Sequence, residues 1–431
     1  MAFYKTLDAS TEFSTKLIQE LIAEHKEYIE AYKELKDFYT GNHAILKQKA
    51  KDKYKPDNRL VVNFAKYIVD TFNGYFIGNP VSLFHEDETV NDYLAYIDGY
   101  NDQSDNNAEL SKICSIYGHG FELLFNDENS EIGITYMTPI DGFVVYDNTI
   151  QNKPLFACHY GMNDDDEEVG YFYTKEAVYQ FATVSGAYTI VEETPNVFGD
   201  IPMIEYIENE ERQSIFENVK TLINAFNKAL SEKANDVEYY ADAYLKVLGA
   251  EIDEKTLQTL RDTRIINVSG DDTLTVEFMT KPSADGTQEN LLERLQKLIF
   301  EISMVANISD ENFGDSSGIA LRYKLQSMDN LAKSKERKFQ SGMSRRYRLI
   351  SNYPTSKIGE NEWVNIQYKF TRNVPANLAE EADIAQTLSG IVSEETQVGV
   401  LSIVQNAKEE VKRKNEEIET TDAFTRTAEG K

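Results

Sequence analysis

The residues best suited to chemistry in this chain form a short loop, Asn312 to Gly318, with the sequence NFGDSSG. Small residues in such a loop can bring backbone N–H groups close to an anion at the start of a helix. This loop lacks the lysine that a nucleotide-binding loop places beside the phosphates, and no strand precedes it. We therefore expect a loop that connects two helix ends rather than a nucleotide site.

No other pattern of reactive residues converges on an active site. The sequence has no GxxxxGK[ST], HExxH or paired CxxC motif, which disfavours an ATP-driven motor and the usual zinc sites. Its five histidines, at positions 25, 43, 85, 119 and 159, have no metal-ligand spacing. His119 lies between two glycines, a pattern typical of a turn before a strand, and Cys114 lies on an apolar helical face, where we expect a buried thiol. The sequence thus predicts no catalytic residue, no metal site and no cofactor.

An acidic cluster, Asp164 to Glu168, lies between two strand-like segments. Adjacent side chains point to opposite sides of an extended chain, so these carboxylates do not converge on one ion. We expect a solvated hairpin turn at this position.

Composition limits the class of protein. A chain of 431 residues favours two to four domains, and its 41% hydrophobic residues suffice to bury their cores. A formal charge of −29 disfavours a repressor or a nuclease that grips DNA by its phosphates, but it allows a surface that DNA slides past. Two cysteines exclude a disulfide framework, and the sequence shows neither a signal peptide nor a long apolar run. We therefore expect a soluble protein made inside the cell.

Hydrophobic spacing predicts the elements that position these residues. Apolar residues at helical spacing predict a helix over 11–39, and a second apolar segment covers 60–76. From 118 to 206 the alternating and aromatic runs predict an antiparallel sheet region. The sequence of residues 363–370 predicts a strand, and the mostly polar region 376–419 is predicted to be helical.

A pair of long helices is expected in the middle of the chain. Neither Gly nor Pro occurs from Met203 to Leu248, and the apolar stripe there predicts a helix of about 35 residues and roughly 50 Å. A second helix is predicted over 289–308. Between them, 249–282 contains a small helix (254–261) and two strand-like pieces. We infer an α-hairpin with a small α/β cap, which is too small to stand alone and would lean on neighbouring copies.

A third long helix is predicted from Ala320 to about Ser351, with an apolar side and a basic side. The apolar side comprises Leu325, Met328, Ala332, Phe339, Met343 and Ile350, and the basic side comprises Lys333, Arg337, Lys338, Arg345 and Arg348. Residues 319–350 contain nine Lys or Arg against two Asp or Glu, a local charge of +7. These cations either pair with acidic surface on a neighbouring subunit or contact DNA phosphates.

The order of these parts resembles the portal family of tailed phages, in the branch found in phages of Gram-positive bacteria. The similarity extends to about Pro375, and its most telling segment is NFGDSSGIALRYKL (312–325). Other segments that carry it are YTGNHAIL (39–46), NRLVVNFAKYIVDTFNGYFIGNPV (58–81), YGHGFELLF (117–125), FGDIPMIEYIENEE (198–211) and SIFENVKTLINAFNKALSEKANDVEYYADAYLKVLG (214–249).

The resemblance implies an α+β chain with the phage portal fold: a long stem α-hairpin with an inserted small α/β clip, a mixed α/β wing and a helical crown. The implied boundaries are wing 1–210, stem helix 211–247, clip 248–285, stem helix 286–308, tunnel loop 309–318, wing 319–375, and crown with C-terminal tail 376–431. The implied DNA-facing residues of the tunnel loop are Asn312, Phe313, Gly314, Asp315, Ser316, Ser317 and Gly318.

The resemblance also implies the function and the partners. A portal protein is not an enzyme; it forms a ring of about twelve subunits, a DNA channel at one capsid vertex used for genome packaging, head–tail joining and DNA ejection. Its implied partners are other copies of itself, double-stranded DNA bound without sequence preference, the terminase large subunit, the head–tail adaptor, and the major capsid and scaffolding proteins, with no membrane. Its implied locations are the virion and, during assembly, the host cytoplasm.

Two alternative functions belong to other classes of protein. A carboxylate-bound metal nuclease would need acidic residues that are distant in sequence but meet in space, and it predicts metal-dependent DNA cleavage. A tail adaptor would also form a ring, but adaptors are much shorter and lack a long hairpin with an inserted cap. Both remain weaker than the portal hypothesis at this point.

Overall fold

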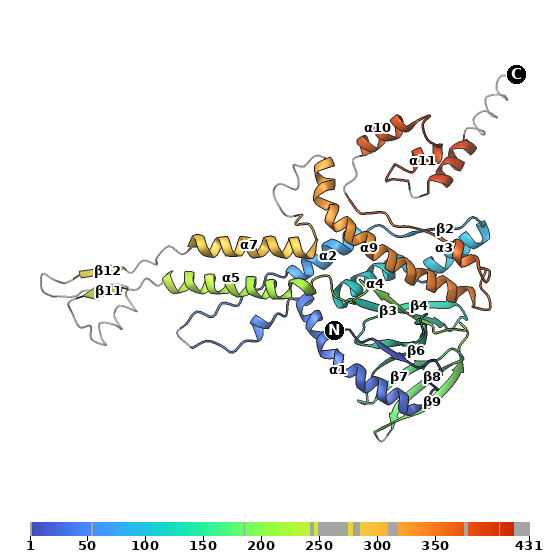
Figure 1. Ribbon diagram of the computed structural model, residues 1–431, viewed down its shortest axis with the longest axis horizontal. Coiled ribbons are helices and arrows are strands. Elements are labelled where there is room, and N and C mark those ends of the chain that lie inside the picture. The colour runs from blue at the N-terminus through green and yellow to red at the C-terminus, as the bar shows by residue number, and fades with distance from the viewer. Residues whose placement is uncertain are drawn as a thin grey trace. The chain divides into compact units, whose positions relative to one another are not determined.

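The structure is a computed structural model of the chain, and it describes residues 2–52, 55–184, 186–241, 245–248, 275–278, 285–308, 318–374, 378–404 and 406–417. The chain divides into two compact units. The first unit comprises Met1–Tyr32, Asp70–Ser214 and Val305–Lys431, and the second comprises Lys33–Val69 and Ile215–Met304. Helices and strands occur together, so the predicted mixed α and β composition is confirmed (Figure 1).

The largest sheet of the first unit has six strands in the order β1-β5-β6-β7-β8-β9. β1 and β5 are parallel, and the other neighbours are antiparallel. This confirms the antiparallel region predicted over 118–206. Strand β1 was not predicted, because it has only three residues and no sequence pattern that indicates a strand. The strands are β1 (Lys5–Leu7), β5 (Gly142–Asp147), β6 (Pro154–Met162), β7 (Glu168–Tyr173), β8 (Ala177–Val184) and β9 (Ala187–Pro195).

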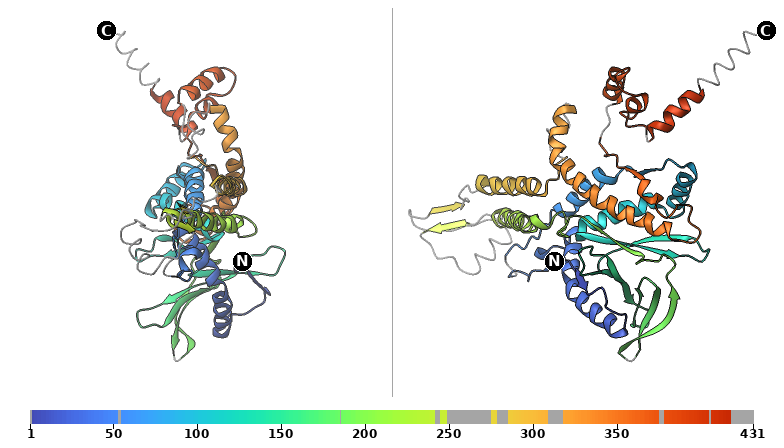
Figure 2. Two further views of the ribbon diagram at one scale, coloured as in Figure 1. Left: turned by 90° about the vertical axis from the view of Figure 1, so that its left-hand side faces the viewer. Right: turned by 45° about the vertical axis from the view of Figure 1, so that its right-hand side comes forward.

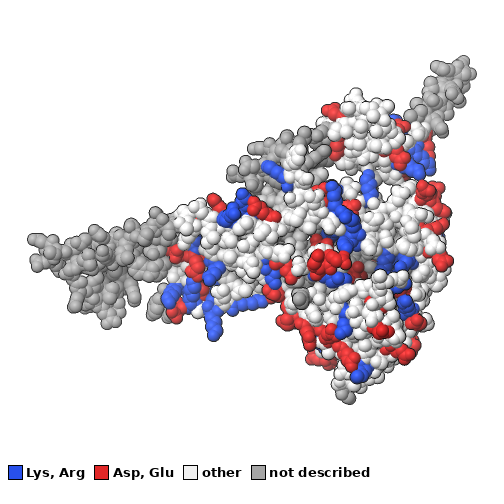
Figure 3. Space-filling view, in the orientation of Figure 1, with Lys and Arg blue, Asp and Glu red and all other residues white. Residues whose placement is uncertain are grey.

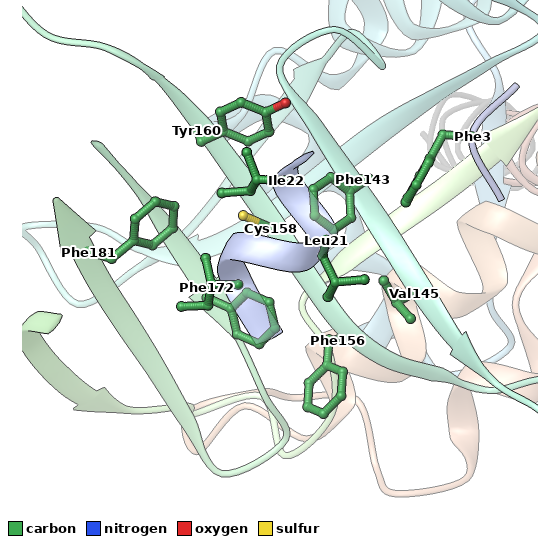
Figure 4. Packing of buried hydrophobic residues seen from close by; sticks show 11 residues of the cluster. Phe3, Leu21, Ile22, Phe143, Val145, Phe156, Cys158, Tyr160, Phe172 and Phe181 are labelled. Atoms are coloured by element: carbon green, nitrogen blue, oxygen red, sulfur yellow. The ribbon is translucent and has the colours of Figure 1, made fainter. Parts of the chain in front are cut away.

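Helix α1 (Thr15–Thr40) covers one face of this sheet. Its buried residues Ile18, Leu21 and Ile22 lie three and four positions apart, so they share one side of the helix. Figure 4 shows Leu21 and Ile22 among the aromatic side chains of the strands. The buried strand residues of this core are Phe143, Val145, Phe156, Cys158, Tyr160, Phe172 and Phe181.

A second sheet of the first unit has the order β10-β3-β4, with β3 (His119–Asn126), β4 (Ile132–Met137) and β10 (Met203–Ile207). Helix α4 (Gln103–Tyr117) leads directly into β3 through Gly118, whose φ is +87°. A Cβ at this position would lie 2.1 Å from the carbonyl oxygen of Arg212, so only glycine fits. The thiol of Cys114 is buried, as predicted, and its Sγ lies 3.3 Å from the Tyr206 carbonyl oxygen.

Further helices and a short strand pair complete the first unit. Strands β2 (Ser82–Phe84) and β13 (Gln367–Lys369) pair antiparallel. The strand predicted over 363–370 is therefore confirmed only at 367–369, and Glu362–Asn365 form the 3-10 helix η3 instead. The long basic helix is α9 (Gly318–Ser351), close to its predicted bounds. The other helices are α2 (Phe64–Ile77), which ends in this unit, α3 (Glu88–Tyr100), α10 (Leu378–Leu388), α11 (Glu394–Val398) and residues 407–417.

The second unit contains a pair of helices, α5 (Lys220–Ala241) and α7 (Asp285–Ser303), that lie side by side (Figures 1 and 2). Lys233 forms an ion pair with Glu289, and Gln288 donates a hydrogen bond to Asp236 at 3.0 Å. Short 3-10 turns flank the pair at Ala44–Lys47 (η1) and Glu217–Val219 (η2). Leu292, Leu295 and Ile299 of α7 are buried at helical spacing.

The first helix of this pair is shorter than the sequence predicted. Of the expected stem helix over 211–247, the described residues are helical from Lys220 to Ala241, which is 22 residues and about 33 Å. Residues 217–219 form the 3-10 helix η2 and residues 245–248 form β11. The predicted helix was too long because the absence of Gly and Pro permits a helix without requiring one.

Most of the predicted cap lies outside the described residues, including the small helix over 254–261 and the strand-like RIINVS. Strand β12 (Thr275–Phe278) falls within the predicted LTVEFM segment and pairs antiparallel with β11 (Leu245–Leu248). In the part of the chain that the structure describes, no helix combines the length and the apolar character needed to cross a bilayer.

Candidate functional site

Helix α9 carries the basic residues that the sequence singled out, and packing fixes its orientation. The six apolar residues predicted to share one side, from Leu325 to Ile350, are all buried. Two cations, Lys335 and Arg346, are buried with them, at 1% and 0% exposure. The helical projection assigned neither of these cations to the core.

Lys335 is a fully bonded buried ammonium. Its Nζ lies 2.6 Å from Oε2 of Glu208 and donates to the Ser111 carbonyl oxygen at 2.9 Å and to Oγ of Ser115 at 2.7 Å. The ring of Phe72 lies 5.3 Å away, within cation–π range. An ammonium has three donors, so its hydrogen-bonding capacity is used. These contacts tie α9 to α4 and to the segment that follows β10.

Arg346 makes the second buried ion pair of α9. Its Nε donates to Glu122 of β3 at 2.8 Å, its Nη2 contacts the same carboxylate, and Nη2 also donates to Oδ1 of Asn107 at 2.7 Å. Glu122 is 2% exposed, so neither charge reaches solvent. Because loss of one partner would leave the other charge buried and unpaired, the pair fixes the position of α9 on the β3 sheet.

His119 belongs to a buried polar network that resembles a catalytic arrangement in its composition. Its Nδ1 lies 2.6 Å from Glu205, its Nε2 lies 2.8 Å from the hydroxyl of Tyr32, and Arg212 donates to Glu205 at 2.7 and 2.8 Å. Burial opposes ionisation of Glu205, but the hydrogen bonds from Arg212 and His119 outweigh it and hold its pKa well below the usual range. Tyr32 and His119 are each 1% exposed, so no substrate reaches this imidazole and the network is structural.

Four of the five basic residues predicted on the other side of α9 pair with carboxylates of their own unit. The pairs are Lys333 with Asp329 at 2.7 Å, Lys338 with Glu210, Arg345 with Asp200 at 3.4 Å, and Arg348 with Asp200 at 2.8 Å. Arg337 is exposed and has no hydrogen bond or ion pair with any described residue. On the face drawn in Figure 3, Lys and Arg are likewise interspersed with Asp and Glu.

The sequence as a whole matches a known family. Residues 18–423 match the model of the family described as phage portal protein, SPP1 Gp6-like. The chain belongs to this portal family. The match covers nearly all of the chain, so it includes both compact units and helix α9. This family consists of structural portal proteins rather than enzymes.

Two curated relatives in the portal family support the assignment. The portal protein of Bacillus phage SPP1 is 26% identical over 446 aligned positions, which cover 94% of this chain and 87% of that protein. The portal protein of Clostridium phage phiCD119 is 26% identical over 373 positions, which cover 78% of this chain and 79% of that protein.

Similarity to solved structures is weaker than the similarity to the portal family. A chain of the neck of an empty GTA particle, computed with C6 symmetry, superposes with a TM-score of 0.46 at 12% identity. The superposition covers 78% of this chain and 89% of that chain. A similarity at this level carries no argument about the fold or the function.

The loop that most resembles the portal family in sequence, 312–317, lies outside the described residues. Its last predicted member, Gly318, is the first residue of α9. Within the described residues, no group of three or more His, Cys, Asp or Glu side chains is arranged to hold a metal ion. Of the acidic cluster predicted over 164–168, residues 164–167 form the exposed turn between β6 and β7, as expected, whereas Glu168 begins β7 and pairs with Lys26 at 2.8 Å.

Proposed function

We propose that the chain assembles into a closed ring at one vertex of a phage capsid and forms the channel for DNA packaging, head–tail joining and DNA ejection. The observation that carries this proposal is the match of residues 18–423 to the portal family. The two curated relatives, each named a portal protein, support it over most of their own lengths.

The charge distribution suits a channel wall that DNA slides past. Each phosphate that a free cation neutralises adds salt-sensitive affinity, so many free cations would hold the duplex in place. On α9, four of the five predicted surface cations pair with carboxylates such as Asp200, and only Arg337 among the five lacks a partner within the described chain. The net charge of −29 repels phosphates elsewhere. Weak attraction and broad repulsion together allow movement in both directions.

The parts of the chain take the roles that the portal resemblance implies. In this proposal α5 and α7 form the stem, residues 248–285 form the clip, the first unit with α9 forms the wing, and 376–431 forms the crown and tail. Residues 309–318 form the tunnel loop, and Asn312 to Gly318 face the DNA. The side-by-side packing of α5 and α7 supports the assignment of the stem.

The proposed partners follow from the same role. The ring consists of about twelve copies, the number that the portal resemblance implies, and head-to-tail contacts between identical subunits can close such a ring. It binds double-stranded DNA without reading bases, and it binds the terminase large subunit during packaging and a head–tail adaptor afterwards. The major capsid and scaffolding proteins surround it. Assembly takes place in the host cytoplasm, and the finished ring remains in the virion.

We further propose that the chain has no catalytic activity. The buried position of His119 and the lack of a metal-holding cluster in the described ranges favour this over a nuclease. Purified protein incubated with duplex DNA and Mg²⁺ or Mn²⁺ should leave the DNA intact. Cleavage that disappears on addition of a chelator would favour the nuclease alternative.

Sedimentation of the purified full chain tests the proposed assembly. A ring gives a discrete species with the mass of about a dozen subunits at micromolar concentration. A species that remains monomeric, even with scaffolding and capsid proteins present, would contradict the proposal.

The proposed tunnel loop has its own test. Replacing Gly314 and Gly318 with Leu should reduce DNA packaging by at least about tenfold while rings still form, because bulky side chains narrow the channel. Packaging of DNA into capsids is measured by nuclease protection, and ring formation by sedimentation. Loss of the rings themselves would instead assign the loop a role in subunit packing.

A further inference from the structure

The first unit contains a pocket whose charged lining residues are mainly cationic. It has a volume of about 470 Å³ and lies where α9 meets β10 and the start of β6. Four of its lining side chains are cations and one is a carboxylate, and its wall includes the only tryptophan of the chain. The residues that matter for its chemistry are Arg212, Lys338, Arg345, Arg348, Glu205 and Trp363.

The cations of this pocket are only partly neutralised. Arg345 and Arg348 share one carboxylate, Asp200, and the Nε of Arg345 is buried without a hydrogen-bond partner. Burial lowers the pKa of Arg345, which shows that the nearby carboxylate does not fully compensate for lost water. With Glu205, Glu210 and Asp200 counted against the four cations, one positive charge remains in a chain of net charge −29. The pocket therefore favours an anionic occupant.

The same unit presents an anionic group with no cation partner. The turn between β6 and β7 carries Asp164, Asp165, Asp166 and Glu167, and none of them forms an ion pair within the described chain. Asn163 fixes the turn, because its Oδ1 accepts hydrogen bonds from the backbone N–H groups of Asp165 at 3.1 Å and Glu167 at 2.8 Å. Four like charges held in one fixed turn repel one another, and a cationic surface would relieve that repulsion.

The turn and the pocket lie at opposite ends of one strand. Pro154, the first residue of β6, lines the pocket, whereas Met162, the last residue of β6, precedes the acidic turn. Nine residues of strand separate the two ends by roughly 25 Å. A chain therefore cannot place its own turn in its own pocket. A contact between two different patches of identical chains is head-to-tail, and such contacts close into a ring when the rotation between neighbouring chains divides a full turn.

We propose that the acidic turn of one subunit, Asp164 to Glu167, docks into the cationic pocket of the next subunit, beside Arg345, Arg348 and Trp363. The proposal rests on the proposed ring and names one of its contacts. A concave pocket of this size admits a turn with carboxylate side chains, whereas a DNA duplex is a convex rod whose backbone cannot enter it. The pocket therefore suits a neighbouring copy better than it suits DNA.

Cysteine cross-linking in the full chain tests this contact directly. Cys114 and Cys158 are both buried and free, so introduced cysteines supply the accessible thiols. We expect D165C/S341C rings to give a ladder of covalent multimers on mild oxidation, because Ser341 is an exposed residue of the pocket wall. The matched control is E128C/S341C, which places the thiol on a different exposed hairpin turn, between β3 and β4, and should give no ladder.

Charge removal provides a second, independent measurement. In D164N/D165N/D166N the ring should dissociate at a protein concentration about tenfold higher than in wild type, and its stability should depend less on salt. The control E128Q/E192Q/E360Q removes the same number of exposed negative charges elsewhere and should behave as wild type. The fluorescence of Trp363, the single tryptophan, should shift on assembly of wild type but not in a turn variant kept dissociated.

The outcomes distinguish failure of the docking inference from failure of the proposed ring. Wild-type rings with no more cross-linking in D165C/S341C than in the control would overturn the docking inference and leave the ring standing. A wild type that never forms rings would contradict both. If the turn variant assembles normally but K338A/R348A rings lose affinity for duplex DNA, the pocket binds phosphate instead, and the docking inference fails.

Discussion

On the buried side of α9, Lys335 and Arg346 each face a carboxylate that is almost inaccessible to solvent. On its exposed side, Lys338 and Arg348 pair with Glu210 and Asp200 while remaining 36% and 40% exposed. The residue types are the same on both sides, and so is the chemistry of their partners. The two sides of α9 differ in how far solvent reaches the ion pairs. A buried pair becomes essential to the fold once it has formed, whereas a pair at the surface can exchange partners at little cost.

Because of this difference, the basic composition of a helix by itself gives limited information about its function. The local charge of +7 over 319–350 includes cations that never reach a partner molecule. Of the remaining cations, several line one pocket and are partly neutralised there. A count of basic residues therefore overstates how strongly α9 would attract DNA. The attraction also depends on where the carboxylate partners of these residues lie.

Removing Arg346 should have the largest effect. We expect R346M to lower the free energy of unfolding by about 3–5 kcal/mol, because Glu122 would keep its charge in a buried site without a counterion. Urea unfolding followed by circular dichroism measures the loss. R337M is the matched control, since Arg337 is exposed on the same helix, and it should change stability by less than about 0.5 kcal/mol. Equal effects of the two variants would contradict the distinction drawn here.

The coupling free energy between Lys335 and Glu208 tests the same difference between buried and exposed ion pairs. K335M alone should cost about 3 kcal/mol, whereas K335M combined with E208Q should recover part of that loss, since no unpaired charge then remains. The interaction free energy comes from a double-mutant cycle measured by urea unfolding. The corresponding cycle for Lys338 and Glu210 serves as the exposed control. A coupling at Lys335 no larger than at Lys338 would contradict the account.

Acid should weaken the network around Glu205. Its pKa in the folded protein is held below the ordinary value, so its contribution is fully present above the unfolded pKa of about 4.3 and is lost as the pH falls through the folded value. We expect E205Q to cost about 2 kcal/mol at pH 7, and the gap to wild type should narrow below about pH 4. Unfolding measured from pH 7 to pH 3 tests this. A gap that widens in acid would show that the carboxylate is not the stabilising form.

The surface pairs should show the smallest effects. K338A and K333A should each change the free energy of unfolding by about 0.5 kcal/mol or less, since both pairs are solvent-exposed and screened by salt. Thermal unfolding at low and high salt measures the difference. A loss above about 2 kcal/mol at either position would mean that the exposed side of α9 also holds the fold.

Sequence patterns predicted the elements whose packing is local. The six apolar residues from Leu325 to Ile350 on α9 were predicted to share one side, so the buried side of this helix was visible in the sequence. The start of α5 was not visible in the sequence, because a turn and the 3-10 helix η2 precede it although no Gly or Pro interrupts these residues. The roles of the buried cations were also not visible. Arg346 meets Glu122 across 224 residues, and no local pattern reports a contact of that separation.

The pocket beside Trp363 depends on contacts of the same long-range kind. The sequence identified Lys338, Arg345 and Arg348 as a basic group, but their carboxylate partners come from distant segments. The acidic residues 164–168 were predicted to form a solvated hairpin turn, and the proposed docking role of 164–167 rests on their distance along β6 from the pocket, which no local sequence pattern reports.

Negative-stain electron microscopy of the purified full chain tests the proposed function most directly. The account predicts closed rings with a central hole that admits a DNA duplex, and with a subunit number that matches the mass in solution. A population of compact particles without a hole, in the presence of scaffolding and capsid proteins, would contradict the portal ring.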